Sequence, residues 1–195
     1  MAKALNRQEI LENLKILADW LRVKHPDDHF ELIVVGGAAM ALEGFKDQTT
    51  DIDVIRPEVL PEQIINGVAH IGKIRRLSSG WLNSNAANIF LKTKRSVVIP
   101  EYFNEISRTI EVDENLRIRL IGRQALISLK LYAATPSYSK HTTDINRLEP
   151  NVKEIIEAVR FVLSLDGTEV RKDDLRVLLK EMGFDFDDLY KTIKT

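Results

Sequence analysis

The sequence predicts an α+β fold in which a small mixed β-sheet is flanked by helices and followed by a helical C-terminal part. Two observations predict it. Short β-rich runs alternate with helical patterns up to about residue 121, and from residue 122 onward every pattern is helical. We therefore expect two domains, residues 1–121 with the mixed sheet and residues 122–195 with helices alone.

The first element is a helix over residues 7–23. Asn6 is a candidate N-cap and Glu9 follows three residues later, which is the spacing of a capping box. Apolar residues then recur at helical intervals, and the polar stretch KHPDDHF ends the pattern.

The next elements form a strand, a helix and a second strand. ELIVV, residues 31–35, is a β-rich run that ends in Gly36-Gly37. A compact helix over residues 38–43 follows. After a polar turn, DIDVI predicts a strand over residues 51–55. Asp51 and Asp53 are two residues apart, so on a strand their side chains point to the same face.

The remaining elements are a helix, a hairpin and the C-terminal helices. Pro61 opens a helix to about Gly72, and the residues up to 103 are weakly patterned. TIEV and LRIRLI flank the turn DEN and predict a β-hairpin over residues 109–121. The predicted C-terminal helices span residues 123–134, 143–148, 152–165, 171–182 and 185–193.

The composition excludes several classes of protein. The 195 residues include no cysteine, so any metal must be held by oxygen or imidazole ligands. No run approaches the roughly 20 apolar residues of a membrane span, and the N-terminus lacks the apolar region of a signal peptide. We expect a cytoplasmic protein with no membrane partner. The histidines show no metal-ligand spacing.

Positive charge is concentrated in one part of the chain, although the net charge is −1. Between Gly72 and Lys130, eleven basic residues face five acidic ones. A solvated basic face and a phosphate-binding or RNA-binding surface are equally good interpretations. The basic residues are Lys73, Arg75, Arg76, Lys92, Lys94, Arg95, Arg108, Arg117, Arg119, Arg123 and Lys130.

The glycine pair and the two aspartates fit one substrate. Carboxylates on one strand face can converge on Mg²⁺ or Mn²⁺, which leaves its other positions to water and phosphate oxygens. Gly36 and Gly37 let a phosphate approach the backbone at the start of a helix. Each feature alone is common, since most Gly-Gly pairs after a strand are only tight turns.

The spacing of the two features is more specific. Gly36-Gly37 followed by Thr50-Asp51-Ile52-Asp53 resembles the signature of the DNA polymerase β-like nucleotidyltransferase superfamily. The stretch ALISLKLYAATPSYSKHTTDINRL, residues 125–148, resembles the later motifs of AbiEii-type nucleotidyltransferases, which include toxins of type IV toxin-antitoxin systems. In those proteins a lysine on an apolar helix precedes an aspartate at the next helix, and Lys130 and Asp144 match.

These resemblances imply the site and its ligands. Asp51 and Asp53 would hold the metal, and Lys130 and Asp144 would complete the catalytic set. A nucleoside triphosphate would be the substrate, RNA such as tRNA the favoured acceptor, and an antitoxin a possible protein partner. One position departs from the pattern, because Asp47 stands where AbiEii-like proteins carry arginine. The nucleotide-binding residues would be Gly36, Gly37, Thr50 and Lys46, the last as a replacement for that arginine.

Several residues have a second interpretation. Lys130 could extend to water instead of entering a polar site, and Asp144 could only cap a helix. Glu111 is a candidate third carboxylate but could be merely solvated. Trp81, with Ser79, Asn83 and Asn85, could line a groove, although packing is the better interpretation of the tryptophan.

Three functions are compatible with these patterns. The leading one is metal-dependent transfer of a nucleoside monophosphate from a triphosphate to a hydroxyl. The second is a non-catalytic protein of the same fold that binds a nucleotide or a partner, which the departure at Asp47 favours. The third is a metal-dependent phosphohydrolase, for which no histidine accompanies the aspartates.

Overall fold

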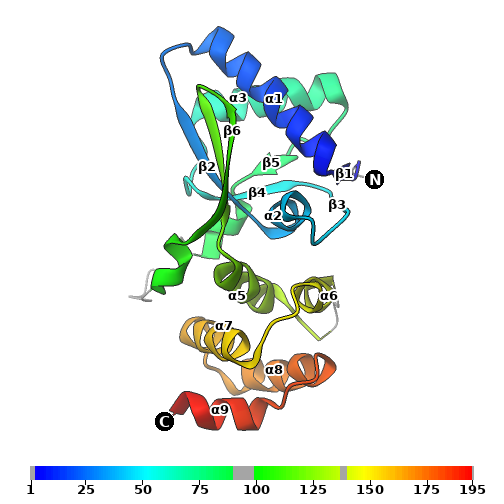
Figure 1. Ribbon diagram of the computed structural model, residues 1–195, viewed down its shortest axis with the longest axis vertical. Helices are drawn as coiled ribbons and strands as arrows, with labels where there is room; N and C mark the ends of the chain where they lie inside the picture. Colours follow the sequence, from blue (N-terminus) through cyan, green and yellow to red (C-terminus); the bar gives the residue numbers. More distant parts are fainter. Residues whose placement is uncertain (1–2, 90–98, 137–139, 195) are drawn as a thin grey trace. The chain divides into compact units, whose positions relative to one another are not determined.

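The computed structural model describes residues 3–89, 99–136 and 140–194, which fall into two compact units (Figure 1). The first unit consists of the described residues within 1–94 and 106–121, and the second of those within 95–105 and 122–195. Each unit is described by itself below.

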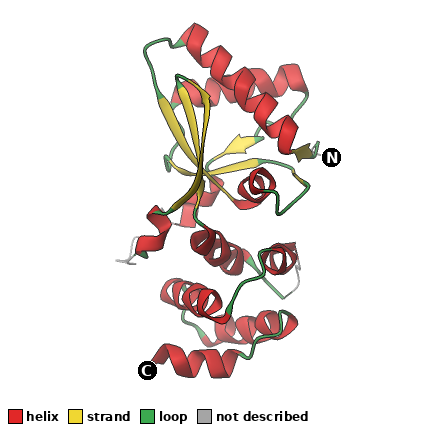
Figure 2. Cartoon of the chain, viewed as in Figure 1, coloured by secondary structure: helices red, strands yellow, loops and turns green. Residues whose placement is uncertain are grey.

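A five-stranded mixed sheet forms the centre of the first unit (Figure 2). Its strand order is β5-β4-β2-β7-β6. β2 lies in the middle, antiparallel to β4 and parallel to β7, so the expected mixed sheet is confirmed. The strands are β2 (Phe30–Val35), β4 (Ile52–Arg56), β5 (Leu82–Asn83), β6 (Ile106–Asp113) and β7 (Leu116–Ile121).

Helices pack around this sheet. α1 (Arg7–Lys24) begins with the expected capping box, in which Asn6 and Glu9 bond each other's backbone N–H groups. It packs against α3 (Glu62–Arg75), and α2 (Gly36–Glu43) packs against β4. β1 (Leu5–Asn6) pairs with β3 (Gln48–Thr49) in a separate two-stranded ladder, and a 3₁₀ turn spans Asn85–Ala87.

Helices are the regular elements of the second unit within its described residues, and Thr135 forms an isolated β-bridge. Asn151 opens the third of its α-helices with a second capping box, closed by Glu154. Apolar side chains of these helices, including Leu131, Phe161 and Leu178, are buried in a common core. The helices are the 3₁₀ turn Glu101–Asn104, α5 (Arg123–Ala133), α6 (Lys140–Arg147), α7 (Val152–Leu165), α8 (Glu169–Glu181) and α9 (Phe186–Lys194).

Most element bounds agree with the sequence patterns within two residues, whereas the end of α3 and the starts of β6 and α6 each lie about three residues beyond their predicted positions. α2 begins at Gly36 instead of residue 38, because glycine adopts the positive φ of +67° with which the chain enters the helix. α6 begins at Lys140 instead of residue 143, because polar residues fill its first turn and give no apolar signal. No helix in the described ranges has the length and apolarity to cross a membrane.

Candidate nucleotide site and the buried lysine–aspartate pair

The turn at Gly36 lies directly against the carboxylate of Asp53. Val35 and Asp53 are paired residues of β2 and β4, so Gly36 leaves the sheet beside the aspartate. A Cβ atom at position 36 would lie 2.9 Å from Oδ2 of Asp53, closer than real Cβ atoms approach an oxygen. The predicted proximity of the glycine pair and the D-x-D strand is therefore present within the first unit.

Gly37 makes an equally close approach to Thr49. A Cβ atom at position 37 would lie 2.5 Å from Oγ1 of Thr49, a buried hydroxyl. Thr49 is placed there by the β1–β3 ladder, in which it pairs with Leu5. Two separate ladders thus bring a polar side chain against each of the two glycines that open α2, and a side chain at either glycine would collide with it.

Asp51 and Asp53 flank Ile52, the first residue of β4. Both carboxylates are half-buried, and Asp51 lies next to Thr50, whose hydroxyl donates to it over 3.3 Å. Ile52 between them is fully buried, which holds both aspartates at the surface of the unit. Lys46 and Asp47 lie in the turn that leads from α2 to β3.

The donor set fits magnesium or manganese. Two carboxylates are what Mg²⁺ takes from a protein when substrate phosphates and water supply its other ligands. The described part of the chain contains no group of three or more histidines or acidic residues that could form a complete protein cage. A metal bound here would therefore depend on a further ligand from substrate or water.

Glu111 does not join this pair, so its role as a third carboxylate is corrected. It lies on β6 opposite Arg117, which donates to it over 2.7 Å. Arg117 pairs in turn with Glu31 near the start of β2, whereas Asp53 pairs with Val35 at the end of that strand. By strand geometry Glu111 is about 20 Å from Asp53.

Trp81 is a packing residue, as the preferred interpretation had it. Its side chain is fully buried and its indole N–H donates to the carbonyl of Val68 over 2.9 Å. Asn83 is the register neighbour of Asp53 on β5, but its side chain is engaged locally with Gly80 and Asn85. The tryptophan therefore lines no groove.

Lys130 and Asp144 form an ion pair inside the second unit. Nζ of Lys130 donates to Oδ2 of Asp144 over 2.6 Å, with the side chains only 6% and 2% exposed. The lysine thus does not extend to water, and that alternative is wrong. Asp144 is the fifth residue of α6, so the capping alternative is wrong as well.

The buried pair is unusual for a helix as apolar as α5. Ala125, Ile127 and Leu131 around the lysine are fully buried, and a charge there is stable only when it is paired and hydrogen-bonded. A well-packed apolar pair would cost less to bury. Conformational order or chemistry is therefore the better reason for the pair than stability.

A comparison with known families adds an independent observation. The family described as nucleotidyltransferase of unknown function (DUF6036) matches residues 12–149, well over half of the chain. The chain belongs to this nucleotidyltransferase family. The matched range includes the glycine turn, both aspartates of the D-x-D strand and the buried ion pair. No curated protein and no solved structure matches the sequence.

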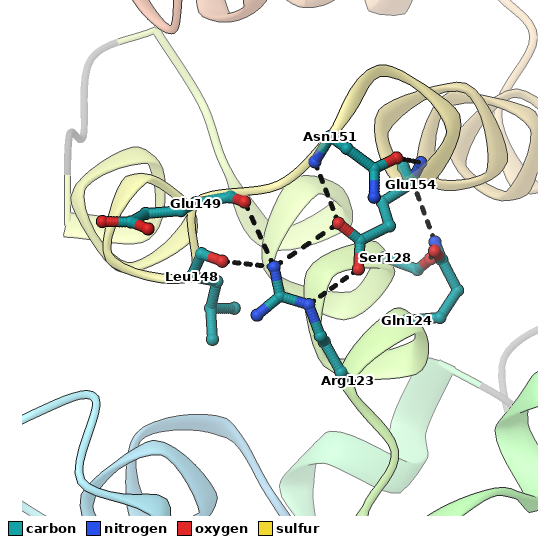
Figure 3. A network of polar contacts seen from close by, with 7 residues as sticks. All are labelled: Arg123, Gln124, Ser128, Leu148, Glu149, Asn151 and Glu154. Carbon is teal, nitrogen blue, oxygen red and sulfur yellow. Dashed lines mark hydrogen bonds and ion pairs between the residues drawn. The ribbon is translucent and has the colours of Figure 1, made fainter.

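Arg123 is a residue of this nucleotidyltransferase that the sequence patterns did not single out for a role. It lies at the start of α5, and its guanidinium reaches the end of α6 and the first turn of α7 (Figure 3). It donates to Oε1 of Glu154 over 2.7 Å, to the carbonyl of Glu149 over 3.2 Å, and to the carbonyl of Leu148. One side chain thereby joins three helices.

Glu154 takes part in this network as a carboxylate. Burial alone raises the pKa of Glu154, but hydrogen bonds from Arg123 and from the backbone N–H of Asn151 outweigh burial and lower it. Gln124 adds a bond of 3.0 Å to the carbonyl of the same glutamate (Figure 3). The charged form is therefore the form that the network favours.

Arg171, a residue of α8, binds the C-terminal end of α5. Its guanidinium donates to the carbonyls of Leu131, Tyr132 and Ala134 over 2.8 to 3.0 Å, and burial lowers its pKa. These carbonyls belong to the last turn of α5, where a helix lacks internal donors. Neither arginine was predicted, because the partners of both are backbone carbonyls or residues far away in sequence.

The basic stretch between residues 72 and 130 is largely neutralised. Lys92, Lys94 and Arg95 lie outside the described residues. Of the eight others, five contact carboxylates, and Lys73, Arg76 and Arg108 are exposed. For the described residues, a solvated, ion-paired face accounts for most of the excess charge. The five paired residues are Arg75, Arg117, Arg119, Arg123 and Lys130.

Proposed function

We propose that the protein is a metal-dependent nucleotidyltransferase that moves a nucleoside monophosphate from a triphosphate to a hydroxyl acceptor. The observation that carries this proposal is the close approach of Gly36 to the Asp53 carboxylate. Membership of a nucleotidyltransferase family supports it independently. We infer that the phosphates of the substrate approach the exposed backbone of the glycine turn, next to the Asp53 carboxylate.

In this proposal Asp51 and Asp53 hold Mg²⁺ or Mn²⁺. The metal, when bound, neutralises negative charge on the phosphate oxygens. Gly36 and Gly37 present backbone N–H groups at the start of α2 to the phosphates, and Thr50 and Lys46 on the flanking turn are the further nucleotide contacts. A side chain at Gly36 would displace the Asp53 carboxylate, and one at Gly37 would displace the Thr49 hydroxyl.

The reaction exchanges one bond to phosphorus for another. The acceptor oxygen forms a bond to the α-phosphorus and loses its proton to a base. The bond from that phosphorus to the bridging oxygen breaks, and pyrophosphate leaves. We assign Lys130 to charge neutralisation during transfer and Asp144 to holding the lysine, because Asp144 already accepts its hydrogen bond over 2.6 Å.

RNA, and tRNA in particular, is the acceptor class that we propose. The resemblance of residues 125–148 to AbiEii-type toxins supports this choice, and a toxin role with an antitoxin as partner follows from the same resemblance. Within the described part of the basic stretch, the exposed Lys73, Arg76 and Arg108 offer charge to a phosphate backbone. A protein hydroxyl is the other acceptor to test.

A labelling experiment tests the proposal. The protein is incubated with total RNA, Mg²⁺ and each α-labelled triphosphate in turn, and wild type is compared with Asp53→Asn. Glu58→Gln is the matched control, because Glu58 is an exposed carboxylate shortly after the same strand. We expect labelled RNA from wild type and the control only.

Three results would overturn the proposal. Equal labelling by wild type and Asp53→Asn would show that the carboxylate takes no part. Triphosphate binding without transfer to RNA or to protein would favour the non-catalytic nucleotide-binding alternative. Release of free phosphate without label transfer would favour a phosphohydrolase.

A further inference from the structure

We infer that Arg123 is a positioning residue that sets the contact between Lys130 and Asp144. The inference rests on the proposed function in so far as it concerns transfer. Its structural part concerns only the second unit, in which α5, α6 and α7 are joined by the guanidinium of Arg123 (Figure 3).

The Arg123–Leu148 contact and the Lys130–Asp144 contact both link α5 to the α6 segment. Arg123 and Lys130 are seven residues apart on α5, which is nearly two turns, so both project from one face. Their targets on the other segment are Asp144 within α6 and the carbonyl of Leu148 just after it, one turn apart. The earlier residue of α5 meets the later residue of the α6 segment, so the two segments run antiparallel.

The link made by Arg123 restrains the end of α6. Glu149 has a φ of +48°, a left-handed conformation that is uncommon outside glycine and that ends the helix. The carbonyls of Leu148 and Glu149, which the ended helix leaves without helical donors, accept from Arg123. A side chain of α5 thus supplies the C-terminal cap of the helix that carries Asp144.

Glu154 keeps the guanidinium in this place. Its carboxylate accepts from Arg123 and from the backbone N–H of Asn151, the latter over 2.9 Å. In return, the side chain of Asn151 accepts from the backbone N–H of Glu154. The acceptor of Arg123 is therefore fixed by the start of α7. At the other end of α5, Arg171 holds the helix through three carbonyls. With both ends of α5 fixed, the position of α6 determines whether Asp144 reaches Lys130.

The variant Arg123→Met removes the guanidinium and its hydrogen bonds but keeps an unbranched, flexible side chain that covers the start of α5. We expect it to reduce kcat roughly 10- to 100-fold with KM for the triphosphate unchanged, because small displacements of a positioned group cost that much. Arg123→Lys recovers only part of the loss, since an ammonium cannot donate in a fork to a carboxylate and two carbonyls. Arg160→Met, which removes a surface ion pair with Glu157 on α7, is the matched control and leaves kcat unchanged.

A double variant separates positioning from simple stabilisation. If Arg123 acts through Lys130, Arg123→Met causes no further loss of kcat in a Lys130→Met background, although it still lowers the thermal midpoint. A loss of the same factor in both backgrounds would overturn the inference. Glu154→Gln is the second variant if Arg123→Met fails to fold, because it preserves the volume of the acceptor and removes its charge.

A readout independent of activity is the ¹⁵N NMR signal of the Lys130 ammonium, assigned with Lys130→Met. A buried, hydrogen-bonded ammonium gives a signal that depends on its acceptor. We expect Arg123→Met to shift or abolish it and Arg160→Met to preserve it, and an unchanged signal in Arg123→Met would overturn the inference. A wild-type protein that transfers no nucleotide would refute the proposed function, and the NMR comparison would still decide the role of Arg123.

Discussion

Gly36 lies against the carboxylate of Asp53 at a distance that leaves no room for a Cβ atom. The contact joins the end of β2 to the start of β4, the two strands between which the candidate nucleotide site is formed. Substitution at this glycine therefore tests the site more directly than substitution elsewhere in the turn.

The first prediction concerns Gly36→Ala. Alanine at φ +67° costs about 1 kcal/mol or more in backbone strain, and its Cβ also displaces Asp53. Gly44→Ala is the control, because Gly44 has a φ of +88° but no atom within 4 Å of the added Cβ. We expect similar backbone strain from both in urea unfolding, and loss of nucleotide transfer from Gly36→Ala alone. Equal activity of the two variants would contradict the prediction.

The second prediction concerns metal and nucleotide. We expect Mg²⁺ together with a non-hydrolysable triphosphate to bind only the folded protein and so to raise its thermal midpoint. At 100 times Kd, such binding adds about 2.7 kcal/mol to the unfolding free energy. Chelation of the metal reverses the rise. In Asp51→Asn and Asp53→Asn the rise is lost, while Glu58→Gln retains it. An equal rise in Asp53→Asn would remove that carboxylate from the metal site.

The third prediction concerns the buried ion pair. Lys130→Met leaves the Asp144 carboxylate buried without its ammonium partner, and Asp144→Leu leaves the ammonium without its carboxylate. Either change costs about 3 to 5 kcal/mol in unfolding free energy, measured in urea. The double variant loses less than the sum of the two, because it leaves no uncompensated charge. Additive losses would show that the charges do not stabilise each other.

The fourth prediction concerns pH. The lowered pKa of Glu154 means that its carboxylate stabilises the folded state, and Arg123 is a main cause of the lowering. This stability is present above the ordinary carboxyl pKa of 4.5 and is lost as the pH falls through the lower folded value.

Arg123→Met should therefore differ from wild type more at about pH 6 than at about pH 3, measured as unfolding free energy. The carbonyl contacts of the arginine do not titrate, so part of the difference remains in acid. Arg160→Met serves as the control. A difference that grows as the pH falls would contradict the prediction.

The sequence predicts those features that local chemistry determines. The capping box of Asn6 and Glu9 identifies the start of α1, the continuous β-rich run identifies β2, and the two β-rich runs around a turn identify the hairpin of β6 and β7. The two-residue strands β1, β3 and β5 could not be predicted, because they exist only through distant partners such as Leu5 opposite Thr49.

The features of the candidate site also divide into those that the local sequence predicts and those that depend on distant residues. The glycine pair and the D-x-D strand are local motifs, and their contact agrees with the spacing that indicated it. The role of Arg123 could not be read from the sequence, because an arginine that binds the carbonyls of Leu148 and Glu149 selects them by position and not by residue type. Glu111 is wrongly predicted for a different reason. Its residue type suits a metal site, but the register of the sheet places it far from Asp53.

The hydrogen bonds from Arg171 to α5 show that residues beyond the matched family range support the helix that carries Lys130. The family match ends at residue 149, yet the carbonyls in the last turn of the helix that bears Lys130 accept hydrogen bonds from Arg171 on α8. A protein trimmed to the matched range would keep every motif and lose this support. Without α8, the carbonyls of Leu131, Tyr132 and Ala134 would need donors from water or from another side chain, so α8 is expected to stabilise the C-terminal end of α5.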